Sequence, residues 1–157
     1  MSQINAILVV CMGNICRSPT MEAILKKRLA EAGLDVRVES AGTISYHQGN
    51  PPDPRSVAAG TARGYDFSAM QAQPVKPSDF AEFDLVLCAD NANYQDLVAQ
   101  CPAHYQHKIQ MFLDYGEAAQ AEVPDPYYGG ENGFELVLDL IEDACDVIID
   151  KIRLSTR

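Results

Sequence analysis

Residues 4–19, with the sequence INAILVVCMGNICRSP, decide the fold of this 157-residue chain. Residues 4–10 form a nearly continuous apolar run, which is typical of a strand buried on both faces of a parallel sheet. A polar, glycine-containing turn follows from Cys11 to Ser18. Pro19 suits the first residue of a helix, with Ser18 as its cap. The stretch therefore predicts a strand, a tight loop and a helix N-terminus in direct succession.

Strands and helices are expected to alternate along the rest of the chain. The patterns predict strands near residues 36–39, 85–88 and 109–113, and helices over 19–32, 54–63 and 91–100. The last helix has the clearest signal, because apolar residues recur at helical spacing on one face. These residues are Phe134, Val137, Ile141, Ala144, Ile148 and Ile152. The length suits one domain, residues 1–157, and the alternation predicts a doubly wound α/β sandwich.

Charge and composition exclude several classes of function. The chain has 12 basic and 22 acidic residues and a net charge of −10, which argues against nucleic acid and against an anionic membrane surface as partners. No signal peptide or membrane-spanning stretch is recognisable, so we expect a cytoplasmic protein. Five cysteines at scattered positions do not form a disulfide framework, and their thiols should be free in a reducing compartment.

The loop from Cys11 to Ser18 has the composition of a phosphate site with a nucleophile. It would lie at the carboxyl end of the sheet, where such folds bind ligands, and its backbone N–H groups could surround an anion at a helix N-terminus. A cysteine placed there is stabilised as the thiolate, which is the nucleophilic form. Arg17 could grip two phosphate oxygens through its planar guanidinium. Ser18 could donate its hydroxyl to the thiolate, and Gly13 and Asn14 tolerate a left-handed backbone.

A second segment, residues 123–129, offers the acid that such a reaction needs. Asp125 lies between two prolines, which stiffen the loop, and could protonate a departing phenolate and then activate water. Two tyrosines follow it, which suit the wall of a slot for a phenyl ring. Taken alone, the segment would be an ordinary Asp-Pro turn. The three histidines have no metal-ligand spacing with the cysteines, and we expect neither metal nor cofactor.

These motifs resemble those of low-molecular-weight protein tyrosine phosphatases. Residues 11–19 are similar to the phosphate loop of that family, and residues 125–129 to its acid loop. Similar stretches occur in order between them, at residues 38–43, 49–53, 80–84 and 88–90. The resemblance implies a single-domain three-layer sandwich with a central four-stranded parallel sheet and helices on both faces. It also implies hydrolysis of phosphotyrosine in proteins through a phosphocysteine, by a monomer or weak homodimer.

The resemblance also implies roles for individual residues. Cys11 would be the nucleophile, Arg17 the clamp and Asp125 the acid and base, with Asn14, Ser18 and Ser40 in support. The phosphate-binding loop would comprise Met12, Gly13, Asn14, Ile15, Cys16, Arg17 and Ser18. The substrate walls would be Met12, Tyr46, Tyr127 and Tyr128. His47, beside Tyr46, is a further candidate for substrate contact.

Cys16 has two compatible interpretations. It could be a small side chain packed beneath the loop. The resemblance also suggests that it forms a reversible disulfide with Cys11, which would protect the nucleophile from irreversible oxidation.

The sequence departs from the family near Met70, where relatives often carry a histidine that supports the asparagine of the loop.

Two other functions remain open. One is an arsenate reductase, which would need further cysteines to relay a disulfide, and the other is a phosphotyrosine-binding module without turnover.

Overall fold

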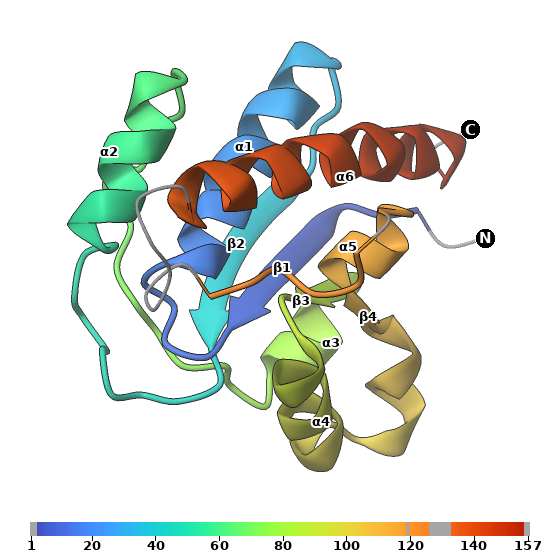
Figure 1. The fold of residues 1–157 in the computed structure, drawn as a ribbon. Helices are drawn as coiled ribbons and strands as arrows, with labels where there is room; N and C mark the ends of the chain where they lie inside the picture. The colour runs from blue at the N-terminus through green and yellow to red at the C-terminus, as the bar shows by residue number, and fades with distance from the viewer. Residues whose placement is uncertain (1–2, 119, 126–132, 156–157) are drawn as a thin grey trace.

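Four parallel strands form the central sheet of the computed structural model, which describes residues 3–118, 120–125 and 133–155 (Figure 1). The strands are β1 (Ala6–Cys11), β2 (Arg37–Gly42), β3 (Leu85–Cys88) and β4 (Ile109–Met111). Their order in the sheet is β2-β1-β3-β4. The first crossover therefore leads to one side of β1 and the second leads to its other side. Such a switch point leaves a crevice at the carboxyl end of β1, where Cys11 lies.

Strand β1 is buried along its whole length, which explains its continuous apolar sequence. Its side chains alternate between two hydrophobic cores. Ile7, Val9 and Cys11 belong to the core beneath α1 and α6, whereas Leu8 and Val10 belong to the core beneath α3 and α4. Cys11 thus points to the same side of the sheet as the helix that follows it.

The helices lie on both faces of the sheet, as Figure 1 shows. On the face of the larger core lie α1 (Arg17–Glu31), α2 (Pro54–Ala62) and α6 (Gly133–Ser155), together with the short α5 (Phe112–Tyr115). On the other face lie α3 (Asp79–Glu82) and α4 (Asn91–Gln100), followed by a 3-10 turn, η1 (Ala103–Lys108). The predicted three-layer sandwich with a four-stranded parallel sheet is confirmed.

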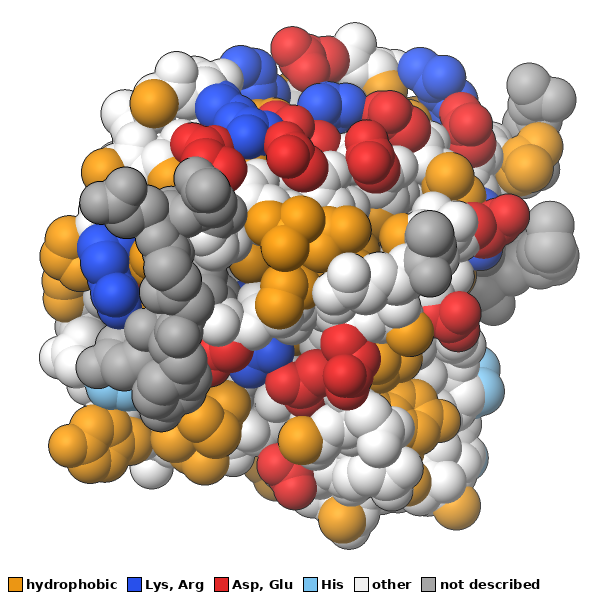
Figure 2. Space-filling model, in the orientation of Figure 1, with side chains coloured by type: hydrophobic (Ala, Val, Ile, Leu, Met, Phe, Trp, Pro, Cys, Tyr) orange, Lys and Arg blue, Asp and Glu red, His pale blue; other side chains and the backbone are white. Residues whose placement is uncertain are grey.

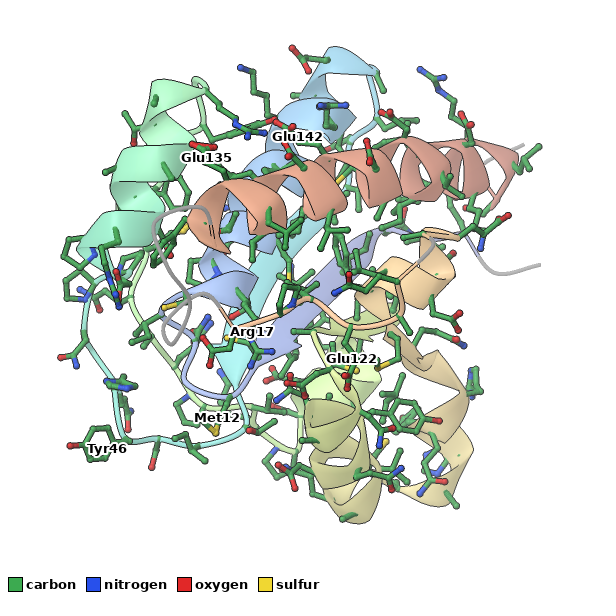
Figure 3. The ribbon with its side chains drawn as sticks, in the orientation of Figure 1. Met12, Arg17, Tyr46, Glu122, Glu135 and Glu142 are labelled. Atoms are coloured by element: carbon green, nitrogen blue, oxygen red, sulfur yellow. The ribbon has the colours of Figure 1, made fainter. Side chains whose placement is uncertain are left out.

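Helix α6 covers α1 with one apolar face and carries most of its acidic residues on the other. Val137, Ile141 and Ile148 are buried, as their spacing predicts. Figure 2 shows acidic side chains along this helix with basic ones among them. Arg63, just after α2, bonds to Glu135 and Glu142 of α6, which Figure 3 labels. These ion pairs join α6 to the end of α2.

The observed elements match the predicted ones closely in some places and correct them in others. Strand β3 and helix α4 have the predicted bounds, and α2 ends one residue before the predicted position. Helix α1 begins at Arg17 rather than at Pro19, and Cys16 rather than Ser18 is its N-terminal cap residue. Ser18 does not cap the helix, because its hydroxyl lies next to Cys11.

The region around β4 also differs from the prediction. The strand ends at Met111, and the two apolar residues that follow it begin helix α5 instead of extending the strand. A short apolar run fits a buried strand or a buried helical turn equally well, so its pattern could not separate the two.

Among the described helices, none is long and apolar enough to cross a membrane.

Candidate active site

The loop between β1 and α1 turns its carbonyl groups outward. The carbonyl oxygen of Cys11 accepts from Thr43 N at 3.0 Å, that of Met12 from Ile44 N at 3.1 Å, and that of Ile15 from Asp53 N at 2.7 Å. Because neighbouring segments occupy these oxygens, we expect the loop amides to face its interior, as the Asn14 amide does by donating to Cys11 Sγ at 3.3 Å. Amides arranged in this way, at the start of a helix, form a site for an anion.

Two small residues shape the loop, although in different ways. Asn14 adopts a left-handed conformation with φ of 58°, which asparagine tolerates better than most residues. Gly13, which the sequence also suggested for such a conformation, does not have a positive φ. Glycine is needed here for another reason: a Cβ at position 13 would lie only 2.9 Å from Cδ2 of His47.

Cys11 is held by two groups of its own loop. Its Sγ lies 3.0 Å from Ser18 Oγ and accepts from Asn14 N at 3.3 Å. The amide of Asn14 donates from Nδ2 to Ser18 Oγ at 2.8 Å and to Ser40 Oγ at 3.0 Å. Asn14 thus joins the loop to strand β2.

Asn14 also receives support from the segment after α2, although not from Met70. Its Oδ1 accepts from Gln73 N at 2.9 Å. In the described part of the chain Met70 is no hydrogen-bond partner of Asn14, and its side chain packs against the larger core. A backbone amide therefore fixes which end of the Asn14 side chain faces Ser18 and Ser40.

Arg17 links the loop to two segments that are distant in the sequence. Its Nη1 donates to Asp90 Oδ2 at 2.7 Å and to the carbonyl of Val123 at 3.0 Å. Burial alone would lower the pKa of Arg17, but the nearby Cys11 and Asp90 raise it above its ordinary value. The guanidinium is therefore a permanent positive charge beside the thiol.

One cavity of about 250 Å³ joins the two predicted motifs. Its lining includes Cys11, Arg17 and Asp125, the rest of the loop at Met12, Gly13, Ile15 and Cys16, and Tyr46 and His47. Figure 3 shows Met12 below Arg17, and Tyr46 at the tip of an outlying loop. Ser40 lies behind the loop and bonds to Asn14. Tyr127 and Tyr128 lie outside the described residues.

Cys16 occupies a different environment from Cys11. It is buried, and burial together with the negative charge of Asp53 raises the pKa of its thiol to about 12. Asp53 is the cap residue of α2, where its side chain accepts from Arg55 N. Hydrogen bonds and the Arg55 charge hold the pKa of Asp53 below its usual value despite burial. Cys16 therefore remains a protonated thiol at neutral pH.

Several contributing residues were not found from the sequence. Asp90, the partner of Arg17, caps α4 directly after β3, so its place at the carboxyl edge of the sheet was a usable signal. Glu22 gave no such signal, since it looks like an ordinary polar residue of a helix. In the structure it is buried and accepts from Ser40 Oγ at 2.7 Å. Within the described ranges, no cluster of three or more His, Cys, Asp or Glu residues could hold a metal ion.

Comparison with known sequences gives one consistent result. Residues 6–156 match the family model for low molecular weight phosphotyrosine protein phosphatase. A protein of Synechocystis named as a putative low molecular weight protein-tyrosine-phosphatase is 48% identical over 150 residues, covering 93% of this chain and 95% of that protein. The human low molecular weight phosphotyrosine protein phosphatase is 37% identical over 154 residues, with coverage of 93% and 94%.

Solved structures agree with the sequence comparison. A protein tyrosine phosphatase from Entamoeba histolytica, crystallised with Hepes in its active site, superimposes with a TM-score of 0.92 at 43% identity and covers 98% of this chain and 99% of its own. YfkJ from Bacillus subtilis gives a TM-score of 0.90 at 35% identity, with 99% of each chain covered.

Proposed function

The chain belongs to the low molecular weight phosphotyrosine protein phosphatase family, and from this premise we propose how its residues carry out the reaction. The protein is a protein tyrosine phosphatase, a phosphoric monoester hydrolase. In our proposal the thiolate of Cys11 is the nucleophile, Arg17 binds the phosphoryl oxygens, and Asp125 transfers the protons. The observation that carries this assignment is the single cavity that all three residues line.

In the first step the Cys11 sulfur attacks phosphorus and the bond from phosphorus to the phenolic oxygen breaks. Asp125 gives its proton to that oxygen, so tyrosine leaves as a neutral phenol. Arg17 uses Nη1 for its bonds to Asp90 and Val123, and its Nε and Nη2 groups can hold two phosphoryl oxygens. The hydroxyl of Ser18 stabilises the sulfur as it attacks and, later, as it leaves.

In the second step water replaces the sulfur on phosphorus. Asp125, now a carboxylate, takes a proton from the attacking water, and the Cys11 thiolate is released with inorganic phosphate as product. Arg17 bonds to the carbonyl of Val123, two residues before Asp125. The hydrogen bond thus holds the guanidinium of Arg17 next to the segment that carries Asp125. This helps to position both side chains around the same phosphoryl group.

The substrates are proteins that contain phosphotyrosine. We assign the walls of the slot to Met12 and Tyr46, with Tyr127 and Tyr128 as further candidates. The 45% exposed Met12 and 84% exposed Tyr46 would flank a phenyl ring on its way to Cys11. Such a slot favours phosphotyrosine, because the shorter phosphoserine does not reach the thiolate.

We also propose the setting in which the protein works. Five free thiols suit a reducing compartment, so we place the protein in the cytoplasm. Its net charge of −10 disfavours nucleic acid and anionic membranes as partners. We take the whole chain, residues 1–157, as one domain that acts without metal or cofactor, as a monomer or weak homodimer.

Cys16 is proposed as the redox partner of the nucleophile. Peroxide would oxidise the Cys11 thiolate to a sulfenic acid, and the Cys16 thiol would displace water from it to form a disulfide. Both cysteines line the same cavity. Reduction by two thiols would return both to their starting state.

The two competing functions fit the site less well. An arsenate reductase would pass a disulfide from Cys11 to another cysteine, but Cys88 belongs to the core on the opposite face of the sheet. A binding module would need no acid in its cavity, whereas Asp125 lines this one.

The direct test is rapid mixing of the protein with an aryl phosphate, followed by an acid quench. We expect a burst of phenol close to one per active site and acid-stable phosphate on Cys11. Steady turnover without a burst would mean that forming the phosphocysteine is the slow step, and the absence of turnover would favour a binding module or an arsenate reductase.

Replacing Asp125 tests the acid separately. We expect Asp125→Ala to lower kcat by roughly 10²–10⁴-fold, the usual range for a lost general acid. The loss should be smaller for substrates with good leaving groups, because these need no proton. An equal loss across a series of aryl phosphates would move the acid role to another residue.

A further inference from the structure

A buried carboxylate, Glu22, closes the hydrogen-bond network behind the phosphate loop. Glu22 lies on α1 and is 6% exposed. Its Oε1 accepts from Ser40 Oγ at 2.7 Å, and its Oε2 pairs with Lys26 Nζ at 2.5 Å. The side chain of Lys26 is 51% exposed. A charged group at the protein surface is therefore connected, through Glu22 and Ser40, to Asn14 and the loop.

The direction of each hydrogen bond in this network follows from the chemistry of its members. An ionised carboxylate can only accept, so Ser40 must give its single hydroxyl proton to Glu22. The oxygen of Ser40 is then an acceptor for Asn14 Nδ2. The orientation of the Asn14 amide agrees with this, because Gln73 N donates to its Oδ1.

The same direction continues to the nucleophile. Asn14 Nδ2 also donates to Ser18 Oγ, so the oxygen of Ser18 is occupied as an acceptor and its own proton must point elsewhere. Two acceptors lie near it, Cys11 Sγ at 3.0 Å and the carbonyl of Ala41 at 3.5 Å. The closer sulfur, which carries the charge as a thiolate, is the better acceptor.

We infer that Glu22 and Lys26 are positioning residues for catalysis, which order the protons of the Ser40–Asn14–Ser18 network so that Ser18 donates to the Cys11 thiolate. This inference rests on the proposed function of Cys11 and Ser18. Lys26 acts by compensating the charge of Glu22, since a buried carboxylate needs a cation and hydrogen-bond donors.

The isosteric variant Glu22→Gln tests the direction of the network. The oxygen of the new amide will face the Lys26 ammonium, so its NH₂ group will point at Ser40. Ser40 Oγ then faces two donors and loses the acceptor for its proton. We expect kcat to fall by about 10-fold, the size of a lost charge-assisted hydrogen bond, and alkylation of Cys11 by iodoacetate to slow in parallel.

Lys26→Met should reduce kcat by about threefold in the wild-type background, since the Lys26 side chain is half-exposed and its charge is partly screened by water. Lys26→Arg should keep kcat at the wild-type value, because arginine can also reach Glu22. Lys27→Met is the matched control, because Lys27 contacts the carbonyl of Gly64 and lies outside the network. We expect this control to retain wild-type activity.

The double variant Glu22→Gln/Lys26→Met distinguishes ordering from simple structural support. Without the ammonium, the amide introduced at position 22 can turn its oxygen back towards Ser40. Lys26→Met should therefore lose its harmful effect in the Glu22→Gln background, or become beneficial. Urea unfolding of each variant checks that the compared proteins are folded.

Two results would overturn the inference. One is Lys26→Met indistinguishable from Lys27→Met, and the other is an undiminished loss from Lys26→Met in the Glu22→Gln background. Lys26 is exposed and Lys27 is partly exposed, so neither substitution enters the core and this comparison stands even if Glu22→Gln fails to fold. Failure of the wild-type protein to form phosphocysteine would instead reject the proposed function itself.

Discussion

The phosphate loop has two sides, and each presents a cysteine to different neighbours. On the side of β2, Cys11 meets the hydroxyl of Ser18, the amide of Asn14 and the charge of Arg17. On the side of α2, Cys16 lies in a buried position beside the carboxylate of Asp53. Hydrogen-bond donors and a cation thus face the first sulfur, whereas burial and a carboxylate raise the pKa of the second thiol.

This difference shows that the residue type alone does not decide which cysteine reacts. Both thiols are buried, and both belong to the same short loop. Hydrogen-bond donors and a cation surround one of them, whereas burial and an anion act on the other. We therefore expect the reactivity of each cysteine to depend on the elements packed against its side of the loop, β2 on one side and the start of α2 on the other.

The largest expected contrast is between the two serine variants. Cys11→Ser should abolish turnover while leaving phosphate binding intact, because the loop amides and Arg17 remain. Cys16→Ser should retain nearly the full initial rate, since Cys16 takes no part in the two chemical steps. Initial rates with an aryl phosphate and phosphate binding by calorimetry measure both.

The same two variants distinguish the catalytic role of Cys11 from the protective role of Cys16 against oxidation. After peroxide treatment, Cys16→Ser should recover less activity with added thiols than the wild-type protein, because Cys11 then oxidises beyond the sulfenic acid. Substantial turnover by Cys11→Ser would reject the nucleophile, and unchanged recovery of Cys16→Ser would reject the protective disulfide.

Removing the Asn14 side chain, which joins the phosphate loop to β2, should lower kcat by less than Cys11→Ser does but by more than the changes described below. Asn14→Ala leaves Gln73 N and Ser40 without their partner and places alanine in a left-handed conformation. We expect kcat to fall by roughly 10- to 100-fold, matching about 1–3 kcal/mol for unsatisfied buried groups. Asn14→Gly is the control, because it relieves the backbone strain without restoring the amide. Wild-type activity of the glycine variant would show that the amide is dispensable.

Replacing Asp53, on the α2 side of the loop, should have a smaller effect, which is on the alkylation rate of Cys16. Asp53→Asn keeps a side chain that can cap α2 but removes the charge that raises the pKa of Cys16. In a Cys11→Ser background, we expect alkylation of Cys16 by iodoacetamide at pH 8 to accelerate by roughly 3- to 10-fold, since each unit of thiol pKa changes the thiolate fraction tenfold.

Peptide mass spectrometry can follow this alkylation site by site. The exposed Asp35 lies before β2, at the opposite edge of the sheet, so Asp35→Asn serves as the control. A rate that does not respond to Asp53→Asn would mean that burial alone keeps Cys16 protonated.

The smallest expected effect concerns stability at high pH. An unfolded cysteine ionises near pH 8.5, whereas the folded Cys16 retains its proton up to about pH 12. Above pH 9 the unfolded chain therefore binds fewer protons than the native one, so the free energy of unfolding falls as the pH rises. Cys16→Ala should lessen this slope by up to about 1.4 kcal/mol per pH unit, the value for one proton. Urea unfolding between pH 9 and 11 measures it, and parallel curves for the two proteins would contradict the raised pKa.

The parts of the fold predictable from sequence are those with local causes. Strand β3 and helix α4 were placed at their observed bounds, because the spacing of apolar residues within each segment is a local signal. The start of α1 was missed by two residues. There, Ser18 has the composition of a helix cap, but a tertiary contact with Cys11 uses its hydroxyl instead.

The same distinction between local and tertiary causes applies to the residues of the functional site. The sequence indicated Cys11, Arg17 and Asp125, because motif and placement together suggest their chemistry, and the structure gathers them around one cavity. Glu22 and Lys26 have the spacing of an ordinary surface pair on a helix. The burial of Glu22 against Ser40 depends on how β2 packs beside α1, which no local pattern records.

The close approach of Gly42 to the phosphate loop has a consequence for how this enzyme can diversify. A Cβ at Gly42 would lie 2.7 Å from the carbonyl of Met12, and the next two amides bond to the same loop. The base of this connection is thus fixed to the catalytic backbone, while Tyr46 at its tip is 84% exposed. Substitutions at the tip are therefore expected to alter which phosphoproteins are accepted without disturbing the chemistry. Insertions near Gly42 would change both at once, so new selectivity should evolve, and be engineered, through the side chain of Tyr46.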